Sequence, residues 1–208
     1  MSEYENHSED RDKVLGALGG KRGLLDSGLP SLLFLLVFTI TKSLNSSLIA
    51  ALIVAGVFTI ARLIKRETIQ HALSGLFGVA ICALLSRHTG KAADFYLPGL
   101  WINIGYAAAY TVANIAGWPL LGIMLGPILG EDFHWRKVSA RKKVYVRAGW
   151  VWVALFGSRL LVQYPLYKSG NIGLLGTARL VMGTPLFAAT AWLTWQILRK
   201  VPTAKPSK

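Results

Sequence analysis

A stretch of 36 residues, at positions 95–130, contains no formally charged side chain. A helix needs about 20 apolar residues to cross the hydrocarbon core of a bilayer. The stretch therefore holds one crossing, and the remainder is too short and too interrupted by glycine and proline for a second. We expect a membrane helix at residues 95–116, followed by an interfacial or re-entrant piece at residues 118–129.

Further apolar segments of the same kind occur along the chain, and none has the polar face of a soluble amphipathic helix. They predict an all-α, multi-pass integral membrane protein with about six transmembrane helices and no large soluble domain. The expected helices cover residues 24–41, 47–64, 69–85, 95–116, 148–166 and 172–197. The expected domains are a disordered cytoplasmic tail at residues 1–20, a transmembrane helical domain at residues 21–198 with an interfacial and basic segment at 118–147, and a disordered basic tail at residues 199–208.

The composition agrees with this fold class. Hydrophobic residues make up 53% of the 208 residues and charged residues 16%, yet the net charge is +13. Such a charge can indicate nucleic acid binding, but cytoplasmic loops of membrane proteins also collect lysine and arginine, so no nucleic acid partner is expected. Cys82 is the single cysteine, which excludes an intramolecular disulfide. The acidic start has no basic-then-apolar order, so no cleavable signal peptide is expected.

The distribution of lysine and arginine predicts the orientation. With six helices and a cytoplasmic N-terminus, 17 of the 23 basic residues lie on the cytoplasmic side. The four on the outer side are Lys42, Arg87, Lys91 and Lys168. This asymmetry predicts that both termini are cytoplasmic.

The two remaining basic residues, Arg159 and Arg179, lie inside expected membrane helices. An arginine at the centre of such a helix costs about 2.5–3.5 kcal/mol on insertion scales, so these residues are usually paired or functional. Gln163 shares a helix face with Arg159, and Asp94 is the carboxylate best placed to meet both arginines. Two interpretations stay open: an ion pair with Asp94 plus snorkelling to the headgroups, or a basic pocket for an anion such as a lipid phosphate.

A stripe of small residues follows one side of the fourth expected helix. It consists of Gly105, Ala109, Ala113 and Gly117. Small residues let membrane helices approach closely. The stripe predicts a helix-packing seam, either within the chain or between two copies of it.

A basic segment follows the apolar stretch. Its candidate cytoplasmic patch consists of Arg136, Lys137, Arg141, Lys142, Lys143 and Arg147. Such a patch binds anionic lipid or a cytoplasmic partner, or serves only to fix the topology.

Signatures of catalysis are missing. The histidines, at positions 7, 71, 88 and 134, have no metal-ligand spacing. No nucleophile elbow, zinc-protease motif or phosphate loop occurs. We therefore expect no enzyme activity, no cofactor and no metal site.

Several motifs carry a resemblance. They are RGLLDSGLPSLLF, LSGLFGVAICALLSRHTGKAADFYLPG, WPLLGIMLG, RLLVQYPLY and ARLVMGTPL. They resemble an uncharacterised family of actinobacterial integral membrane proteins, a domain of unknown function, over about residues 20–198. The early proline–leucine–phenylalanine helix, the charged turn after the second helix and WPLLGIMLG are more distantly similar to the intracellular septation protein A group, associated with envelope synthesis and division. RLLVQYPLY and ARLVMGTPL are not motifs of that group. Neither family supplies catalytic residues, and the resemblance implies the bacterial plasma (inner) membrane.

Two functional hypotheses follow. In the first, the protein is non-enzymatic and acts through membrane partners, including a second copy of itself, in cell-envelope growth or division. In the second, it is a small transporter or channel for an anion, a lipid headgroup or an ion, and uses the intramembrane arginines.

Overall fold

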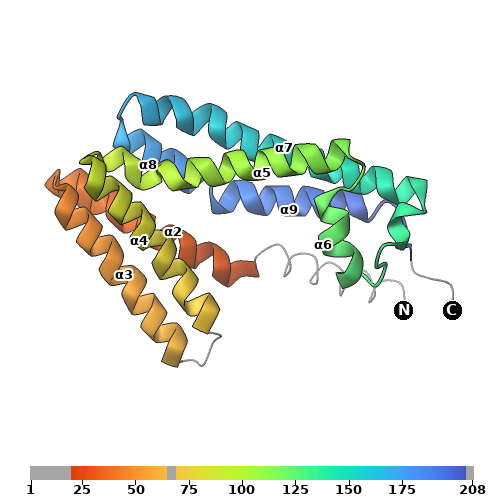
Figure 1. The fold of residues 1–208 in the computed structure, drawn as a ribbon, viewed down its shortest axis with the longest axis horizontal. Helices are drawn as coiled ribbons and strands as arrows, with labels where there is room; N and C mark the ends of the chain where they lie inside the picture. The colour runs from red at the N-terminus through yellow and green to blue at the C-terminus, as the bar shows by residue number, and fades with distance from the viewer. Residues whose placement is uncertain (1–19, 65–68, 205–208) are drawn as a thin grey trace. The chain divides into compact units, whose positions relative to one another are not determined.

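The computed structural model describes residues 20–64 and 69–204, and every regular element in these ranges is helical (Figure 1). In chain order they are α2 (Gly20–Thr41), α3 (Leu44–Ile64), α4 (Ile69–Thr89), the 3-10 turn η1 (Ala92–Tyr96), α5 (Leu97–Ile115), α6 (Leu120–Ile128), the 3-10 turn η2 (His134–Arg136), α7 (Ser139–Lys168), α8 (Ile172–Val181) and α9 (Thr184–Leu198). The expected all-α fold is confirmed for this part of the chain. The tail predicted at residues 1–20 lies outside the described residues except for Gly20. Of the tail predicted at residues 199–208, the structure describes residues 199–204, and the Val201 carbonyl there accepts a hydrogen bond from Arg141.

Helix α7 begins at Ser139, well before the expected start at residue 148. The intervening residues had been assigned to a basic loop. Arginine, lysine and alanine favour helices, and Val144, Tyr145 and Ala148 are buried on one side of the added turns. Much of the basic segment, from Ser139 to Arg147, is therefore the first part of α7.

The last expected helix is interrupted. Helix α8 ends at Val181 and α9 begins at Thr184, with Met182 and Gly183 between them. Pro185 has no N–H to donate to the carbonyl of Val181, four residues earlier, and proline is tolerated best in the first turn of a new helix. The membrane segment expected at residues 172–197 is therefore built from two consecutive helices, and together they form one apolar stretch, Ile172–Leu198, that is long enough to span a membrane.

The short piece expected after the fourth helix is present as α6. Its axis is turned by 83° from that of the preceding helical segment, Ala92–Ile115. Gly117 adopts a left-handed φ of 72°, which glycine reaches without the cost that a side chain adds. This glycine ends α5 and starts the bend.

Two stretches, Leu44–Ala61 and Ile172–Leu198, are long and apolar enough to span a membrane, and the bent α5–α6 pair counts as a third. Two or three such helices indicate a membrane protein, but they are fewer than the six expected. The described apolar parts of α2 and α4, Leu29–Thr41 and Leu73–Thr89, are shorter. In α7, polar residues such as Arg159 and Gln163 interrupt the apolar sequence.

Helix α3 has an uninterrupted apolar outer side. Its exposed members recur every three or four residues, and Ile53 for example is 59% exposed. They are Ile49, Ile53, Val57, Ile60 and Ile64. A contiguous apolar surface of this kind is unfavourable in water and favourable against lipid.

The helices divide into two compact units. Among the described residues, unit 1 consists of residues 103–158 and 185–204, together with Gly20. Unit 2 consists of residues 21–64, 69–102 and 159–184.

In unit 1, aromatic rings and polar side chains join α7 to α5 and α9. The rings of Tyr110 and Trp152 stack with centroids 5.8 Å apart. The Trp152 Nε1–H donates to Thr194 Oγ1 at 2.9 Å, and Asn114 Nδ2 donates to the Val146 carbonyl at 3.3 Å. These contacts fix the register of α7 within the unit.

In unit 2, α3 and α4 lie side by side as consecutive antiparallel helices (Figure 1). Phe34 of α2 stacks on Phe95 of η1, with ring centroids 4.0 Å apart and planes 4° from parallel. Tyr96 meets both rings edge-on. Such aromatic clusters contribute about 0.5–1.5 kcal/mol per pair beyond area burial, so η1 and the Tyr96 carbonyl are firmly positioned.

Candidate functional site

A cavity of about 450 Å³ lies within unit 2, lined by residues of α2, η1, α3, α4, α5 and α8. Most of its lining side chains are apolar or small. Its polar side chains are those of Ser31, Thr59, Ser74, Cys82 and Arg179. The cavity therefore combines an apolar wall with one cation.

Arg179, one of the two arginines expected inside membrane helices, supplies that cation. Its Nη1 donates a hydrogen bond of 3.2 Å to the Tyr96 carbonyl, and its guanidinium carbon lies 5.5 Å from the centroid of the Tyr96 ring. A guanidinium carries five N–H donors. Among the described side chains, no carboxylate lies within 4 Å of it. The Arg179 guanidinium thus borders the cavity without a carboxylate partner among the described side chains.

Gly99 of α5 provides the space for this guanidinium. A Cβ at position 99 would stand 2.7 Å from Arg179 Cζ and from Nη2. That separation is far below van der Waals contact, so any side chain at this position displaces the arginine head.

Arg159 has a different role. Its Nε donates to the Met182 carbonyl at 2.8 Å and its Nη2 to the Gly183 carbonyl at 2.9 Å. The last carbonyls of a helix have no partner within it, and leaving them unpaired in apolar surroundings is costly. Arg159 caps the break after α8 and is not among the residues lining the cavity. Gln163 is buried one turn further along α7, at 3% exposure.

The expected ion pair between Asp94 and an arginine is absent. Asp94 is buried and accepts a hydrogen bond of 2.6 Å from the Tyr167 hydroxyl. Neither Arg159 nor Arg179 lies within 4 Å of its carboxylate. This prediction failed because both guanidinium groups bind main-chain carbonyls, which a residue pattern does not reveal. The hydrogen bond to Asp94, aided by burial, raises the pKa of Tyr167 to about 12.

A family model of proteins of unknown function, DUF3159, matches residues 18–205. The chain belongs to the DUF3159 family. The expected membership of a family of unknown function is thereby confirmed. No curated protein and no solved structure matches the chain.

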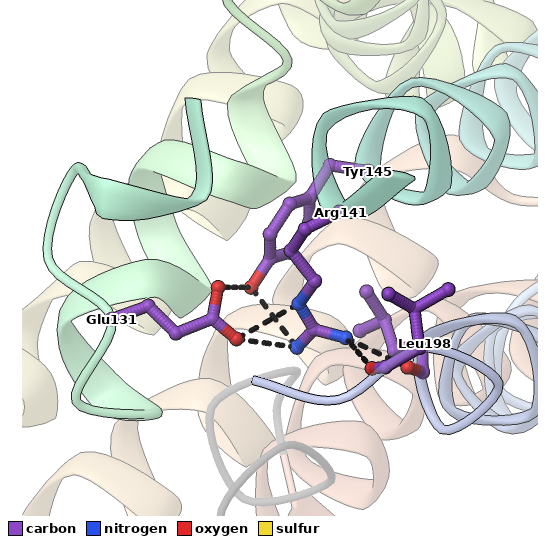
Figure 2. A network of polar contacts seen from close by, with 5 residues as sticks. Glu131, Arg141, Tyr145 and Leu198 are labelled. Atoms are coloured by element: carbon purple, nitrogen blue, oxygen red, sulfur yellow. Dashed lines mark hydrogen bonds and ion pairs between the residues drawn. The ribbon is translucent and has the colours of Figure 1, made fainter. Parts of the chain in front are cut away.

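One residue of the candidate basic patch, Arg141, is buried in the interior of the DUF3159 chain. Arg141 is 2% exposed and pairs with buried Glu131, with 2.5 Å between Nη2 and Oε1 (Figure 2). Its Nη1 donates to the carbonyls of Leu198 and Val201 at 2.7 Å each, and the Tyr145 hydroxyl donates to Glu131 Oε2 at 3.2 Å. Arg141 thus links two parts of unit 1, because it binds both the Glu131 carboxylate and the end of α9.

The other members of the patch remain accessible. Arg136, Lys137, Lys143 and Arg147 are exposed and Lys142 is half-buried. The guanidinium carbon of Arg136 lies 3.4 Å from the ring centroid of Trp118, a cation–π contact. A basic and aromatic surface therefore surrounds the start of α7.

The small-residue stripe of α5 does not form a contact within the described chain over its first half. Gly105 and Ala109 are exposed, and nothing lies within 4 Å of a Cβ built on Gly105. Asn103, Tyr110 and Asn114 form the buried side instead. At Gly105 and Ala109 large polar and aromatic side chains supply the contacts of α5, and a seam between two copies stays a prediction.

Sequence reasoning missed three parts of these sites. The Tyr96 carbonyl is a main-chain group, and nothing in the spacing marks Gly99 as the neighbour of Arg179. Glu131 could have been noticed, because it ends the long uncharged stretch and precedes Arg141 by ten residues.

Proposed function

We propose that this protein is a multi-pass membrane protein that binds an anionic group in the Arg179 cavity of unit 2 without transforming it chemically. One observation carries the proposal. The Arg179 guanidinium borders a cavity of about 450 Å³ and, among the described side chains, has no carboxylate within 4 Å. Binding of this kind is the first step that a transporter for an anion or a lipid headgroup requires.

Placing an arginine inside a membrane helix costs free energy. A central intramembrane arginine costs about 2.5–3.5 kcal/mol on insertion scales. Among the described residues, the hydrogen bond to the Tyr96 carbonyl and the face of the Tyr96 ring compensate only part of this charge. An anionic ligand completes the compensation, since charge-assisted bonds to a guanidinium are about twice as strong as neutral ones.

The test uses thermal unfolding of the detergent-purified protein, followed by tryptophan fluorescence, with sodium phosphate and dioleoyl phosphatidic acid as separate probes. A ligand that binds the folded state raises the unfolding temperature with its concentration. We expect at least one probe to do so for the wild type and for Arg87→Gln, an exposed arginine at the end of α4. Arg179→Gln should abolish the shift. No shift with either probe, or an unchanged shift in Arg179→Gln, would overturn the proposal.

The proposed topology is six crossings with both termini cytoplasmic, in a bacterial plasma membrane. The 17-to-4 distribution of basic residues supports it. Alkaline phosphatase fused after Gly90 or Gly170, two turns with left-handed φ, should be active. Fusions after Arg66 or at the C-terminus should be inactive, and the reverse pattern would contradict the orientation.

A second candidate function is a scaffold that acts through membrane partners in envelope growth or division. The exposed basic residues around the start of α7, beside Trp118, favour it. The distant resemblance to the septation group is the reason for naming envelope growth or division as the process. Replacing the four exposed residues with glutamine should remove partners captured by in-membrane cross-linking while leaving the buried Arg141 intact. Capture that is unchanged in this variant would count against the scaffold.

Self-association through the exposed side of α5 belongs to this second candidate. Cross-linking of Ala109→Cys in a Cys82→Ser background tests it. A dimer band in membranes supports a seam between two copies, and a monomer at every concentration excludes it.

A further inference from the structure

We infer that the anionic group is a lipid-borne phosphate that reaches Arg179 sideways, from the hydrocarbon region of the bilayer. This inference rests on the proposed function and names the ligand class of the same site.

The position of the cavity mouth gives the first argument. Ile81 of α4 and Ile102 of α5 both line the cavity, and each is 57% exposed. A residue that borders both the cavity and the outside marks the opening between them. The opening therefore lies on the surface formed by α4 and the first turns of α5 within unit 2.

The surface around this mouth is apolar. Phe77 and Leu84 of α4 and Trp101 of α5 are 63%, 67% and 64% exposed. A small hydrated anion would lose its water before reaching such a mouth. An amphiphile already holds its hydrocarbon part in this environment, and only its headgroup has to move into the cavity.

The lining gives the second argument. Phe58, Leu76 and Val79 provide an apolar wall, while Arg179 provides a planar fork of donors. Such a fork matches the oxygens of a phosphate in a two-point contact. The volume of about 450 Å³ falls within the range of about 300–1,000 Å³ that is usual for small-molecule sites. The headgroup fits inside, and the acyl chains extend through the mouth.

The charges of the lining residues restrict which lipid headgroups fit the cavity. No aspartate or glutamate is among the described residues that line the cavity. Among these described residues, a choline or ethanolamine group would therefore find no carboxylate to pair with. A phosphate monoester that carries no cation, such as phosphatidic acid, fits the single arginine better.

The experiment measures binding by native mass spectrometry of the purified full-length protein. The probes are dioleoyl phosphatidic acid, dioleoylglycerol with the same chains but no phosphate, and sodium phosphate with no chains. We expect the phosphatidic acid to bind more tightly than either other probe by at least about tenfold, a readily measured difference. Gly99→Ala serves beside Arg179→Gln, because it moves the guanidinium without removing its charge; both should reduce binding.

A matched pair of variants tests the lateral route. Ile81→Trp fills the mouth, whereas Ile53→Trp adds the same ring to an equally exposed position of α3 that does not line the cavity. Only Ile81→Trp should slow the binding of phosphatidic acid. Equal effects of the two variants would overturn the lateral route.

The three probes distinguish a failure of the lipid-phosphate inference from a failure of the proposed anion site. If sodium phosphate binds as tightly as phosphatidic acid and depends on Arg179, the lipid inference fails and the proposed anion site stands. If dioleoylglycerol binds as tightly as phosphatidic acid, the phosphate contributes nothing and the lipid-phosphate inference fails. If neither anion binds, the proposed function fails as well.

Discussion

Gly99 and the head of Arg179 occupy adjoining space, since a Cβ on Gly99 would stand 2.7 Å from Arg179 Cζ. We therefore expect Gly99→Ala to displace the guanidinium from the cavity wall. The arginine is flexible and alanine favours a helix by about 0.5–1 kcal/mol over glycine, so stability should change little. Binding of phosphatidic acid should weaken by about tenfold or more.

Gly56→Ala is the matched control for this variant. It lies in α3 of the same unit, and nothing stands within 4 Å of its Cβ position. Its binding should equal that of the wild type. If both alanine variants bind normally, the position of Arg179 does not matter for the ligand.

Arg159 is expected to support stability rather than binding. Arg159→Met leaves the carbonyls of Met182 and Gly183 without their donor. A buried group left unpaired costs about 1–3 kcal/mol, so the free energy of unfolding should fall by at least about 2 kcal/mol. Arg159→Lys keeps one charged donor and should recover part of this loss. Denaturant unfolding in mixed micelles measures both, and a fully stable Arg159→Met would contradict the capping role.

The Glu131–Arg141 pair should behave as a coupled unit. Removing one partner of a buried ion pair costs about 3–5 kcal/mol, because the other charge is left uncompensated. We expect Arg141→Met and Glu131→Gln each to destabilise unit 1 strongly. The double variant should lose less than the sum of the two. Arg147→Met, an exposed neighbour on α7, should stay within about 0.5 kcal/mol of the wild type. Additive losses in the double-mutant cycle would refute the coupling.

The Tyr167–Asp94 hydrogen bond gives a pH-dependent signature. The pKa of Tyr167 is raised to about 12 in the folded protein, against about 10 in an unfolded chain. A raised pKa means that the folded state favours the protonated phenol. The stabilisation is therefore complete below pH 10 and is lost as the pH rises through about 12.

Tyr167→Phe removes this bond. We expect a loss of about 1.5–3 kcal/mol at neutral pH, the usual contribution of a hydrogen bond to a charged group. Ultraviolet titration of phenolate should also lose one late-titrating tyrosine. An unchanged number of late-titrating tyrosines in the variant would show that Tyr167 is not one of them.

The residue pattern predicted the helical elements because long apolar runs leave a chain in lipid no other way to satisfy its backbone. It separated the short α6 from α5 because one crossing needs about 20 residues, and the remainder is too short and too interrupted by glycine and proline for a second. It missed the break before Thr184, although Pro185 marks it, because the surrounding residues are uniformly apolar. The residue pattern placed Arg159 and Arg179 in one pocket because their positions along the two expected helices give them a similar depth in the membrane. The main-chain carbonyls that bind each arginine depend on packing, and no spacing encodes them.

Cys82 allows the most direct test of the anion site, because it is the single cysteine of the chain and lines the same cavity as Arg179. The measurement is the rate at which N-ethylmaleimide modifies Cys82 in phosphatidylcholine nanodiscs, read by intact-protein mass spectrometry. We expect added phosphatidic acid or sodium phosphate to slow the modification in the wild type and to leave it unchanged in Arg179→Gln. A rate that neither anion changes in the wild type, or that falls equally in Arg179→Gln, would contradict an anion site at Arg179.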